Sequence, residues 1–182
     1  PIAAAGHSYG ELVALCAAGV FSEEVLVELS RKRAEFILAA AGSDPGAMAA
    51  VGADGSTTGD LLAGIDDVVI ANENSPKQTV ISGPTPVVEL AVENLRRQSI
   101  PVQKISVACA FHSPVVAAAS GALASYLESL EIGVAAYPVW SNTFATPYPA
   151  APSEIRAWMA DHIARPVRFA CEIEALHDAG AT

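Results

Sequence analysis

Positive charge is scarce in this sequence. Ten lysines and arginines stand against twenty aspartates and glutamates, which gives a formal net charge of −10 at pH 7. This deficit argues against nucleic acid as a partner, because proteins bind phosphates through lysine and arginine. Charged residues make up only 16% of the chain and hydrophobic residues 52%. That balance excludes a disordered chain and predicts one substantial core, with room for a small inserted unit.

Long apolar runs and cysteines are few as well. The longest apolar run, Leu12 to Phe21, is too short to cross a bilayer, and no secretory signal pattern opens the sequence. The three cysteines, Cys16, Cys109 and Cys171, lack metal-ligand spacing and have apolar neighbours. Buried thiols in a reducing compartment are the interpretation. We therefore expect a cytoplasmic protein with no metal and no membrane segment, and a piece of a longer chain because the first residues already read as a strand.

The opening residues carry the most informative pattern. A short apolar run ends in Gly6-His7-Ser8-Tyr9-Gly10, and an apolar helical pattern follows at once. A strand, a tight turn with serine and a helix form a nucleophile elbow, in which flanking glycines allow close backbone approach and a strained serine. The pentapeptide alone could occur by chance in an alanine-rich turn. The flanking strand and helix favour the elbow, and N–H groups at the helix start would stabilise negative charge there.

A serine nucleophile needs a base, and four histidines are available. His7 adjoins the serine, and adjacent side chains in such a turn point apart, so a structural role is predicted. His162 lies among apolar residues of a helix and His177 near the chain end, and both fit core or surface positions. His112 follows a predicted strand and precedes a predicted helix cap, a place that functional histidines favour. His112 is therefore the candidate base.

A basic cluster follows in the next predicted helix. Arg31 and Lys32 are interpreted as part of its solvated face. Arg33 has a second possible role, since a guanidinium beside the elbow can bind a carboxylate through two parallel hydrogen bonds. The substrate would then be an acid as well as an acyl donor.

The pattern of elements predicts an α/β fold in two subdomains. Residues 46–110 read as a β-α-β-β-α-β unit of the ferredoxin-like type, inserted into a larger layer. Residues 1–45 and 111–182 are expected to form an incomplete α/β-hydrolase-like large subdomain that carries the elbow. The expected strands of the small subdomain are 47–51, 68–71, 78–82 and 100–110, with a turn at 72–76 and helices at 58–62 and from 85.

The segment Gly6–Glu11 reads G-H-S-Y-G-E and resembles the G-H-S-x-G-E motif of malonyl-CoA:acyl-carrier-protein transacylases and of acyltransferase domains in polyketide and polyunsaturated fatty acid synthases. Further matches follow in the same order along essentially the whole chain, and their combination is highly specific. They are Arg33, the segment 72–83 (N-x-N-S-P-x-Q-x-V-I-x-G), Ala110-Phe111-His112-Ser113, and Pro166-Val167-Arg168-Phe169.

The resemblance implies an acyltransferase that moves a malonyl unit from coenzyme A, through an acyl-serine, to the phosphopantetheine thiol of an acyl carrier protein. It implies no bound cofactor, and neighbouring synthase domains such as a ketosynthase. Ser8 would be the nucleophile and His112 the base, oriented by backbone carbonyls near Arg165. The N–H of Tyr9 would be an oxyanion donor, and Arg33 would hold the malonyl carboxylate.

The resemblance also bears on substrate choice, for which Asn74, Cys109 and Phe111 are the remaining candidate substrate-binding residues. Phe111 before the histidine resembles the malonyl-selective pattern H-A-F-H, whereas methylmalonyl-selective domains tend to carry Y-A-S-H. A ring beside the C2 carbon would exclude a methyl branch, a discrimination of about 1–3 kcal/mol. Cys109 replaces the first histidine of that pattern and Tyr9 is bulkier than usual, so a methylmalonyl-selective enzyme stays an alternative.

Two parts of the family pattern lie outside the sequence. They are an N-terminal glutamine whose N–H is the second oxyanion donor, and a closing strand after Gly180. Loss of one donor typically costs about 100- to 1000-fold in rate, so we expect the isolated chain to be poorly active and the intact protein to be active. A serine hydrolase such as a thioesterase would need an acid between Ser8 and His112 and gain nothing from Arg33. A non-catalytic docking scaffold is the other alternative.

Overall fold

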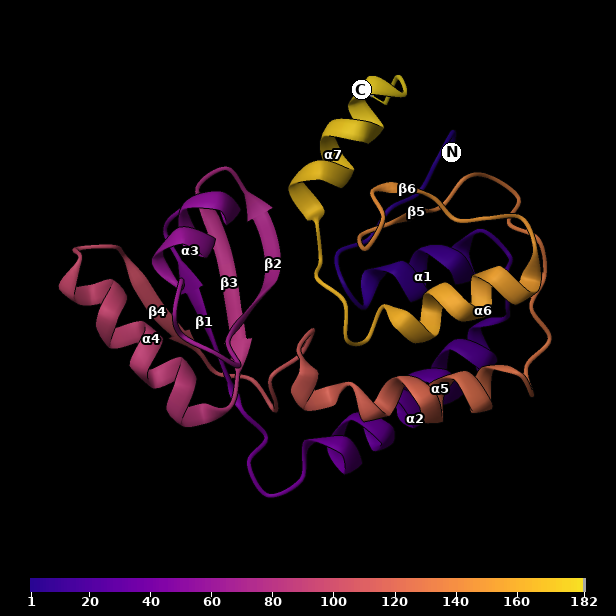
Figure 1. Ribbon diagram of the computed structural model, residues 1–182. Helices are drawn as coiled ribbons and strands as arrows, with labels where there is room; N and C mark the ends of the chain where they lie inside the picture. The colour runs from indigo at the N-terminus through magenta and orange to yellow at the C-terminus, as the bar shows by residue number, and fades with distance from the viewer. Residues whose placement is uncertain (182) are drawn as a thin grey trace.

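Two parts of the molecule lie side by side in the computed structural model, which describes residues 1–181 (Figure 1). A four-stranded sheet with two helices stands at the left of Figure 1, and a group of helices with a two-stranded sheet stands at the right. The last helix, α7 (Phe169–Asp178), stands between them near the top of the view. The mixed α/β class predicted from the sequence is confirmed.

The larger sheet is antiparallel throughout, and its spatial order is β2-β3-β1-β4. Its helices pack on one side, and α4 buries its apolar stripe of Val88, Ala91, Val92 and Leu95 in a core shared with Val51 and Ile81. The elements in chain order are β1 (Ala47–Val51), α3 (Gly55–Leu61), β2 (Val69–Ser75), β3 (Gln78–Gly83), α4 (Thr85–Arg97) and β4 (Val102–Ile105).

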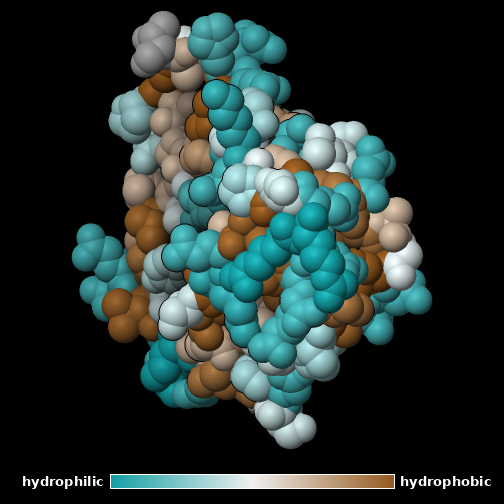
Figure 2. All heavy atoms as spheres, turned by 90° about the vertical axis from the view of Figure 1, so that its left-hand side faces the viewer, coloured by the Kyte–Doolittle hydropathy of each residue, from teal (hydrophilic) through white to brown (hydrophobic). Residues whose placement is uncertain are grey.

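The outer face of α4 is polar. Figure 2 shows the molecule from this side, and hydrophilic side chains cover much of the surface, with hydrophobic atoms visible between them. The amphipathic pattern of one apolar stripe and one charged face explains why this segment folds as a helix against a sheet.

The helical part holds the largest core, in which α2 packs against α5 and α5 against α6. Helix α2 begins after Ser22, whose Oγ accepts a hydrogen bond from the Val25 N–H, and it ends at Gly42, with φ of 62°. The elements of this part are α1 (Gly10–Ala17), α2 (Glu23–Ala41), the 3₁₀ turn η1 (Pro114–Val116), α5 (Ala118–Leu127), β5 (Trp140–Ser141), β6 (Thr146–Pro147), α6 (Pro152–Asp161) and α7.

Several boundaries differ from those predicted. The expected turn at 72–76 is mostly strand, because β2 keeps pairing with β3 up to Ser75 and only residues 76 and 77 turn. Strand β4 ends at Ile105 and not at 110, because its last partner, Met48, lies next to the start of β1. Helix α3 starts earlier than predicted, because Asp54 caps it by accepting from the Thr57 N–H at 2.9 Å.

Backbone hydrogen bonds join the two parts beside the elbow. Val167 forms a parallel bridge with Asn72: its N–H donates to the Ala71 carbonyl and its carbonyl accepts from the Glu73 N–H, both at 2.8 Å. The edge strand β2 is therefore held against the segment that precedes α7. Among residues 1–181, no helix combines the length and apolar character that a bilayer crossing requires.

Candidate active site

Residues 4–10 form the predicted turn into a helix, but the strand expected before it is reduced to a single bridge at Ala4. Ala4 forms a parallel bridge with Val139, and α1 begins at Gly10 directly after the turn. Ser8 sits at the apex with φ of 51°, a left-handed conformation that is strained for a serine. A Cβ on Gly6 would lie 2.2 Å from the carbonyl carbon of Gly10, whereas a Cβ on Gly10 would meet nothing within 4 Å. The close backbone approach predicted for both glycines therefore excludes a side chain only at Gly6.

Ser8 and His112, distant in the chain, form a hydrogen-bonded pair. The Oγ of Ser8 lies 2.7 Å from the Nε2 of His112. The Nδ1 of His112 lies 2.9 Å from the carbonyl oxygen of Arg165 and 3.1 Å from that of His162. Because carbonyls only accept, Nδ1 carries the hydrogen, and Nε2 is left to accept from the serine hydroxyl. This geometry is that of a serine and its general base.

The imidazole of His112 is only 3% exposed. Burial, followed by the nearby positive charge of Arg33, lowers its pKa from 6.5 to about 4, against the smaller opposing effect of the carbonyl hydrogen bonds. His112 is therefore an uncharged base at neutral pH. Its backbone, with φ of 55°, is also left-handed.

Arg33 lies half-buried on α2, and it differs from the two basic residues before it. Arg31 pairs with Glu28 and Glu35, and Lys32 pairs with Glu35 at 3.1 Å. Arg33 makes no ion pair or hydrogen bond with any residue in the described part of the chain, and burial lowers its pKa. Its charge acts on His112, and it also lowers the pKa of the buried Cys109 thiol against the larger effect of burial. The guanidinium of Arg33 thus has no partner among residues 1–181, and its charge acts on the candidate base.

Tyr9 contributes its backbone rather than its ring. Its phenol oxygen lies 2.6 Å from the Ser30 hydroxyl on α2, so the side chain is directed to that helix. The Tyr9 N–H donates to no group among residues 1–181, which leaves it available as an oxyanion donor.

The other three predicted substrate-binding residues are Asn74, Cys109 and Phe111. Asn74 is engaged with protein, since its Oδ1 accepts from the His7 Nε2 at 2.7 Å and its Nδ2 donates to Gln78. Cys109 is fully buried, and Phe111 is half-buried between the core of the helical part and a small cluster of Met48, Ala71 and Val80 on the sheet. Of the three side chains, only that of Asn74 makes hydrogen bonds to described residues.

The sequence analysis missed a buried polar network behind the elbow. The N–H of Ser8 donates to the Oδ1 of Asn142 at 2.5 Å. Asn142 in turn donates from its N–H to Glu11 and from its Nδ2 to Glu172, and all three residues are fully buried. The hydroxyl of Tyr148 also donates to Glu11. Only Glu11 had a sequence signal, because it closes the elbow motif.

Both carboxyl groups of this network are perturbed. Burial raises the pKa of Glu11 from 4.5 to about 8 and that of Glu172 from 4.5 to about 7, although hydrogen bonds from Tyr148 and Asn142 oppose the shift. Of the two histidines for which core and surface positions were both left open, His162 is buried, and its Nε2 lies 3.7 Å from a Glu11 oxygen. His177 lies at the surface, with its side chain 81% exposed.

Known proteins similar to this chain identify its family. The model of the acyl transferase domain family matches residues 1–181. The malonyl CoA-acyl carrier protein transacylase of Synechocystis sp. is 39% identical over 145 residues, covering 79% of this chain and 47% of that protein. The non-reducing polyketide synthase pkiA of Emericella nidulans is 37% identical over 165 residues, covering 90% of this chain and 6% of that protein.

A solved structure shows the same fold. The malonyl CoA-acyl carrier protein transacylase from Burkholderia pseudomallei superposes with a TM-score of 0.90 at 37% identity, over 98% of this chain and 61% of that one. The chain thus spans less than two thirds of each of these relatives. The resemblance seen in the sequence is confirmed, and the chain belongs to the acyl transferase domain family.

Proposed function

We propose that the intact protein transfers a malonyl unit from coenzyme A to an acyl carrier protein, through an acyl-serine at Ser8, in polyketide or fatty acid synthesis. Membership of the family makes the protein an acyltransferase. The observation that carries the finer proposal is the Ser8–His112 pair, at 2.7 Å, beside the unpaired cation of Arg33.

The first half-reaction follows from the hydrogen bonds of His112. Its Nε2 takes the proton of the Ser8 hydroxyl as the oxygen attacks the thioester carbonyl. The Tyr9 N–H stabilises the oxyanion that forms on the carbonyl oxygen. When the C–S bond breaks, His112 returns its proton to the coenzyme A sulfur. The acyl-serine and free thiol remain.

The second half-reaction is the reverse with another thiol. The phosphopantetheine thiol of the carrier gives its proton to His112 and attacks the acyl-serine, and Ser8 regains its hydroxyl hydrogen as the ester bond breaks. A hydrolase would use water at this step. It would commonly orient the histidine with an acid, whereas here two carbonyls hold Nδ1 and no carboxylate of the described residues contacts His112.

Arg33 supplies the selectivity for an acid. A guanidinium with no protein partner, partly removed from water, gains a bidentate carboxylate contact at little cost in broken bonds. Phe111 beside His112 disfavours a branched C2, which makes malonyl the preferred unit over methylmalonyl. Asn74 and Cys109 shape the site around them.

The subdomain assignment is part of the same proposal. Residues 46–110 form the inserted ferredoxin-like subdomain, supported by the element order β1-α3-β2-β3-α4-β4 and the antiparallel spatial order β2-β3-β1-β4. Residues 1–45 and 111–182 belong to the hydrolase-like subdomain, supported by the elbow between the Ala4 bridge and α1.

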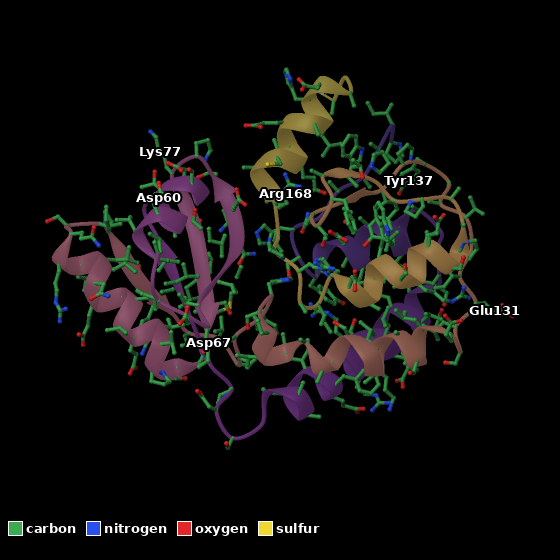
Figure 3. All side chains as sticks on the ribbon, in the orientation of Figure 1. Asp60, Asp67, Lys77, Glu131, Tyr137 and Arg168 are labelled. Carbon is green, nitrogen blue, oxygen red and sulfur yellow. The ribbon has the colours of Figure 1, made fainter. Side chains whose placement is uncertain are left out.

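Carrier docking is proposed near the base of α7. Arg168 lies there between the two parts of the molecule (Figure 3), and the carbonyl of Arg165 accepts from His112. A carrier bound to these arginines would hold its thiol close to the site. The other basic candidates, on α4 and β4, are Arg96, Arg97 and Lys104. Arg97 and Lys104 pair with Glu93 and Glu89, and Arg165 likewise pairs with Asp161 at 3.6 Å.

Mass spectrometry of the intact protein tests the proposal. After brief incubation with malonyl-, methylmalonyl- and acetyl-CoA, we expect malonyl on the peptide that contains Ser8, and no label in Ser8→Ala. Arg33→Ala should lose malonyl loading and gain relative acetyl loading, whereas Arg31→Ala, whose guanidinium pairs on the helix surface, should match the wild type.

The same assay separates the alternatives. Phe111→Ser should raise methylmalonyl loading relative to malonyl by about 10- to 100-fold. Rapid loss of the label to water without a carrier would favour a thioesterase, and no label from any coenzyme A ester would favour a scaffold.

A further inference from the structure

Asn142 occupies a central place behind the reacting pair. Its Oδ1 accepts from the Ser8 N–H, and its backbone carbonyl accepts from the Arg168 N–H at 2.9 Å. Arg168 closes the segment whose Arg165 carbonyl holds the Nδ1 of His112. One residue is thus bonded to the serine turn and to the segment that orients the base. Neither connection passes through the Ser8–His112 contact itself.

The side-chain amide of Asn142 has one permitted orientation. The Ser8 N–H requires an acceptor and therefore faces Oδ1. The Nδ2 group donates to the Glu172 carboxyl oxygen. The backbone N–H of Asn142 is held by Glu11. All four polar groups of this fully buried residue therefore have partners, and rotation of the amide would leave buried groups unpaired.

We propose that Asn142, oriented by Glu172 and Glu11, is a positioning residue that holds the left-handed turn at Ser8 so that its hydroxyl meets the Nε2 of His112. The inference rests on the function proposed above. A serine with φ of 51° needs its surroundings to hold it, and the hydrogen bond to Asn142 is the one made by its backbone N–H. That bond also keeps the Ser8 N–H out of the oxyanion hole and leaves the role to Tyr9.

Substitutions at Asn142 in the intact protein test the proposal through the rate of acyl-serine formation from malonyl-CoA. Asn142→Ala should lower the maximal rate by about 10- to 100-fold with KM within about twofold, because the reacting atoms are misplaced and binding through Arg33 is intact. Thr143→Val is the matched control. It changes the neighbouring residue and removes a buried hydroxyl that has no partner, so the rate should not change.

A reversal of hydrogen-bond polarity separates positioning from general stability. Asn142→Asp keeps an acceptor for the Ser8 N–H but sets a carboxylate against Glu172, so at about pH 8.5 the rate should fall. Adding Glu172→Gln supplies an amide donor to that aspartate, and the double variant should recover at least about half of the lost rate. Glu172→Gln alone keeps an oxygen that accepts from Asn142, and its rate is the reference against which the double variant is compared.

The outcomes are distinct. A wild-type rate in Asn142→Ala would overturn the positioning role. If Asn142→Ala does not fold, the test is the comparison of Asn142→Asp with the double variant Asn142→Asp/Glu172→Gln. A double variant that recovers none of the lost rate would also overturn the positioning role. A wild-type protein that forms no acyl-serine refutes the proposed function instead, before any variant is compared.

Discussion

At the scale of single residues, the state of His112 decides the chemistry. Its pKa of about 4 means that the imidazole is a free base throughout the neutral range, ready to accept the serine proton. The positive charge of Arg33 is the second cause of this low pKa, after burial. The residue proposed to hold the substrate therefore also tunes the base.

Removal of that charge should be measurable. In Arg33→Ala the pKa of His112 should rise from about 4 towards its usual 6.5, since only the charge effect is lost and burial persists. NMR titration of the His112 ring gives the value directly, and Arg31→Ala is the control with an exposed, paired guanidinium. An unchanged pKa would mean that the guanidinium does not face the imidazole.

Sequence reasoning reached the residues to which the proposed function assigns the chemistry. Ser8, His112 and Arg33 could be proposed because an alcohol, an imidazole and a guanidinium at those motif positions each suggest one role. Asn142 and Glu172 could not be proposed from the sequence. Asn142 matters through its hydrogen bond to the Ser8 turn, far away in the chain, and Glu172 through its hydrogen bond to Asn142. No local pattern at 142 distinguishes such an asparagine from one in a loop.

At the scale of elements, the elbow depends on one glycine more than on the other. Gly6→Ala forces a Cβ to within 2.2 Å of the Gly10 backbone, so we expect a loss of about 2 kcal/mol or more in the free energy of unfolding. Gly10→Ala meets open space at the first residue of α1, where alanine is the better helix former, and should gain up to about 1 kcal/mol.

Urea unfolding of the two variants and of the wild-type intact protein measures these differences. Equal effects of the two alanines would contradict the asymmetry of the elbow. The variants are well matched, since each adds one methyl group to the same turn.

Element boundaries were predictable where local chemistry sets them. Ser22 caps the start of α2 and Gly42 follows its last residue, and both are local features that a sequence can reveal. The lengths of β2 and β4 were not predictable in this way. Both end where their neighbours stop pairing, and that register depends on residues from other strands.

At the scale of the whole molecule, buried acids and bases act on stability in opposite directions. A carboxyl group whose folded pKa is raised is stabilising below its unfolded value and loses that contribution as pH rises to the folded value. For Glu11 this window runs from 4.5 to about 8, and for Glu172 from 4.5 to about 7. His112, with a lowered pKa, instead loses stability as pH falls from 6.5 to about 4.

Burial also lowers the pKa of His162, so two histidines oppose two carboxyl groups and the effects largely cancel between pH 4.5 and 6.5. The clearest signal therefore lies above pH 6.5. From pH 6.5 to 8 the free energy of unfolding should fall, by at most about 1.4 kcal/mol per pH unit for each carboxyl group. Glu11→Gln removes one of these groups and should flatten the decline, which denaturant titrations at several pH values would reveal. The same slope in both proteins would show that Glu11 ionises normally.

Ser8 and His112 share an unusual backbone, since both adopt positive φ, a conformation that glycine tolerates far better. The proposed reaction requires, at these two positions, residues that conformational preference alone would replace with glycine. In a related protein that no longer transfers acyl groups, substitution by glycine at either position would relieve backbone strain and increase stability. Glycine at position 8 or 112 of a related sequence would thus indicate a domain that has lost acyl transfer and kept its fold.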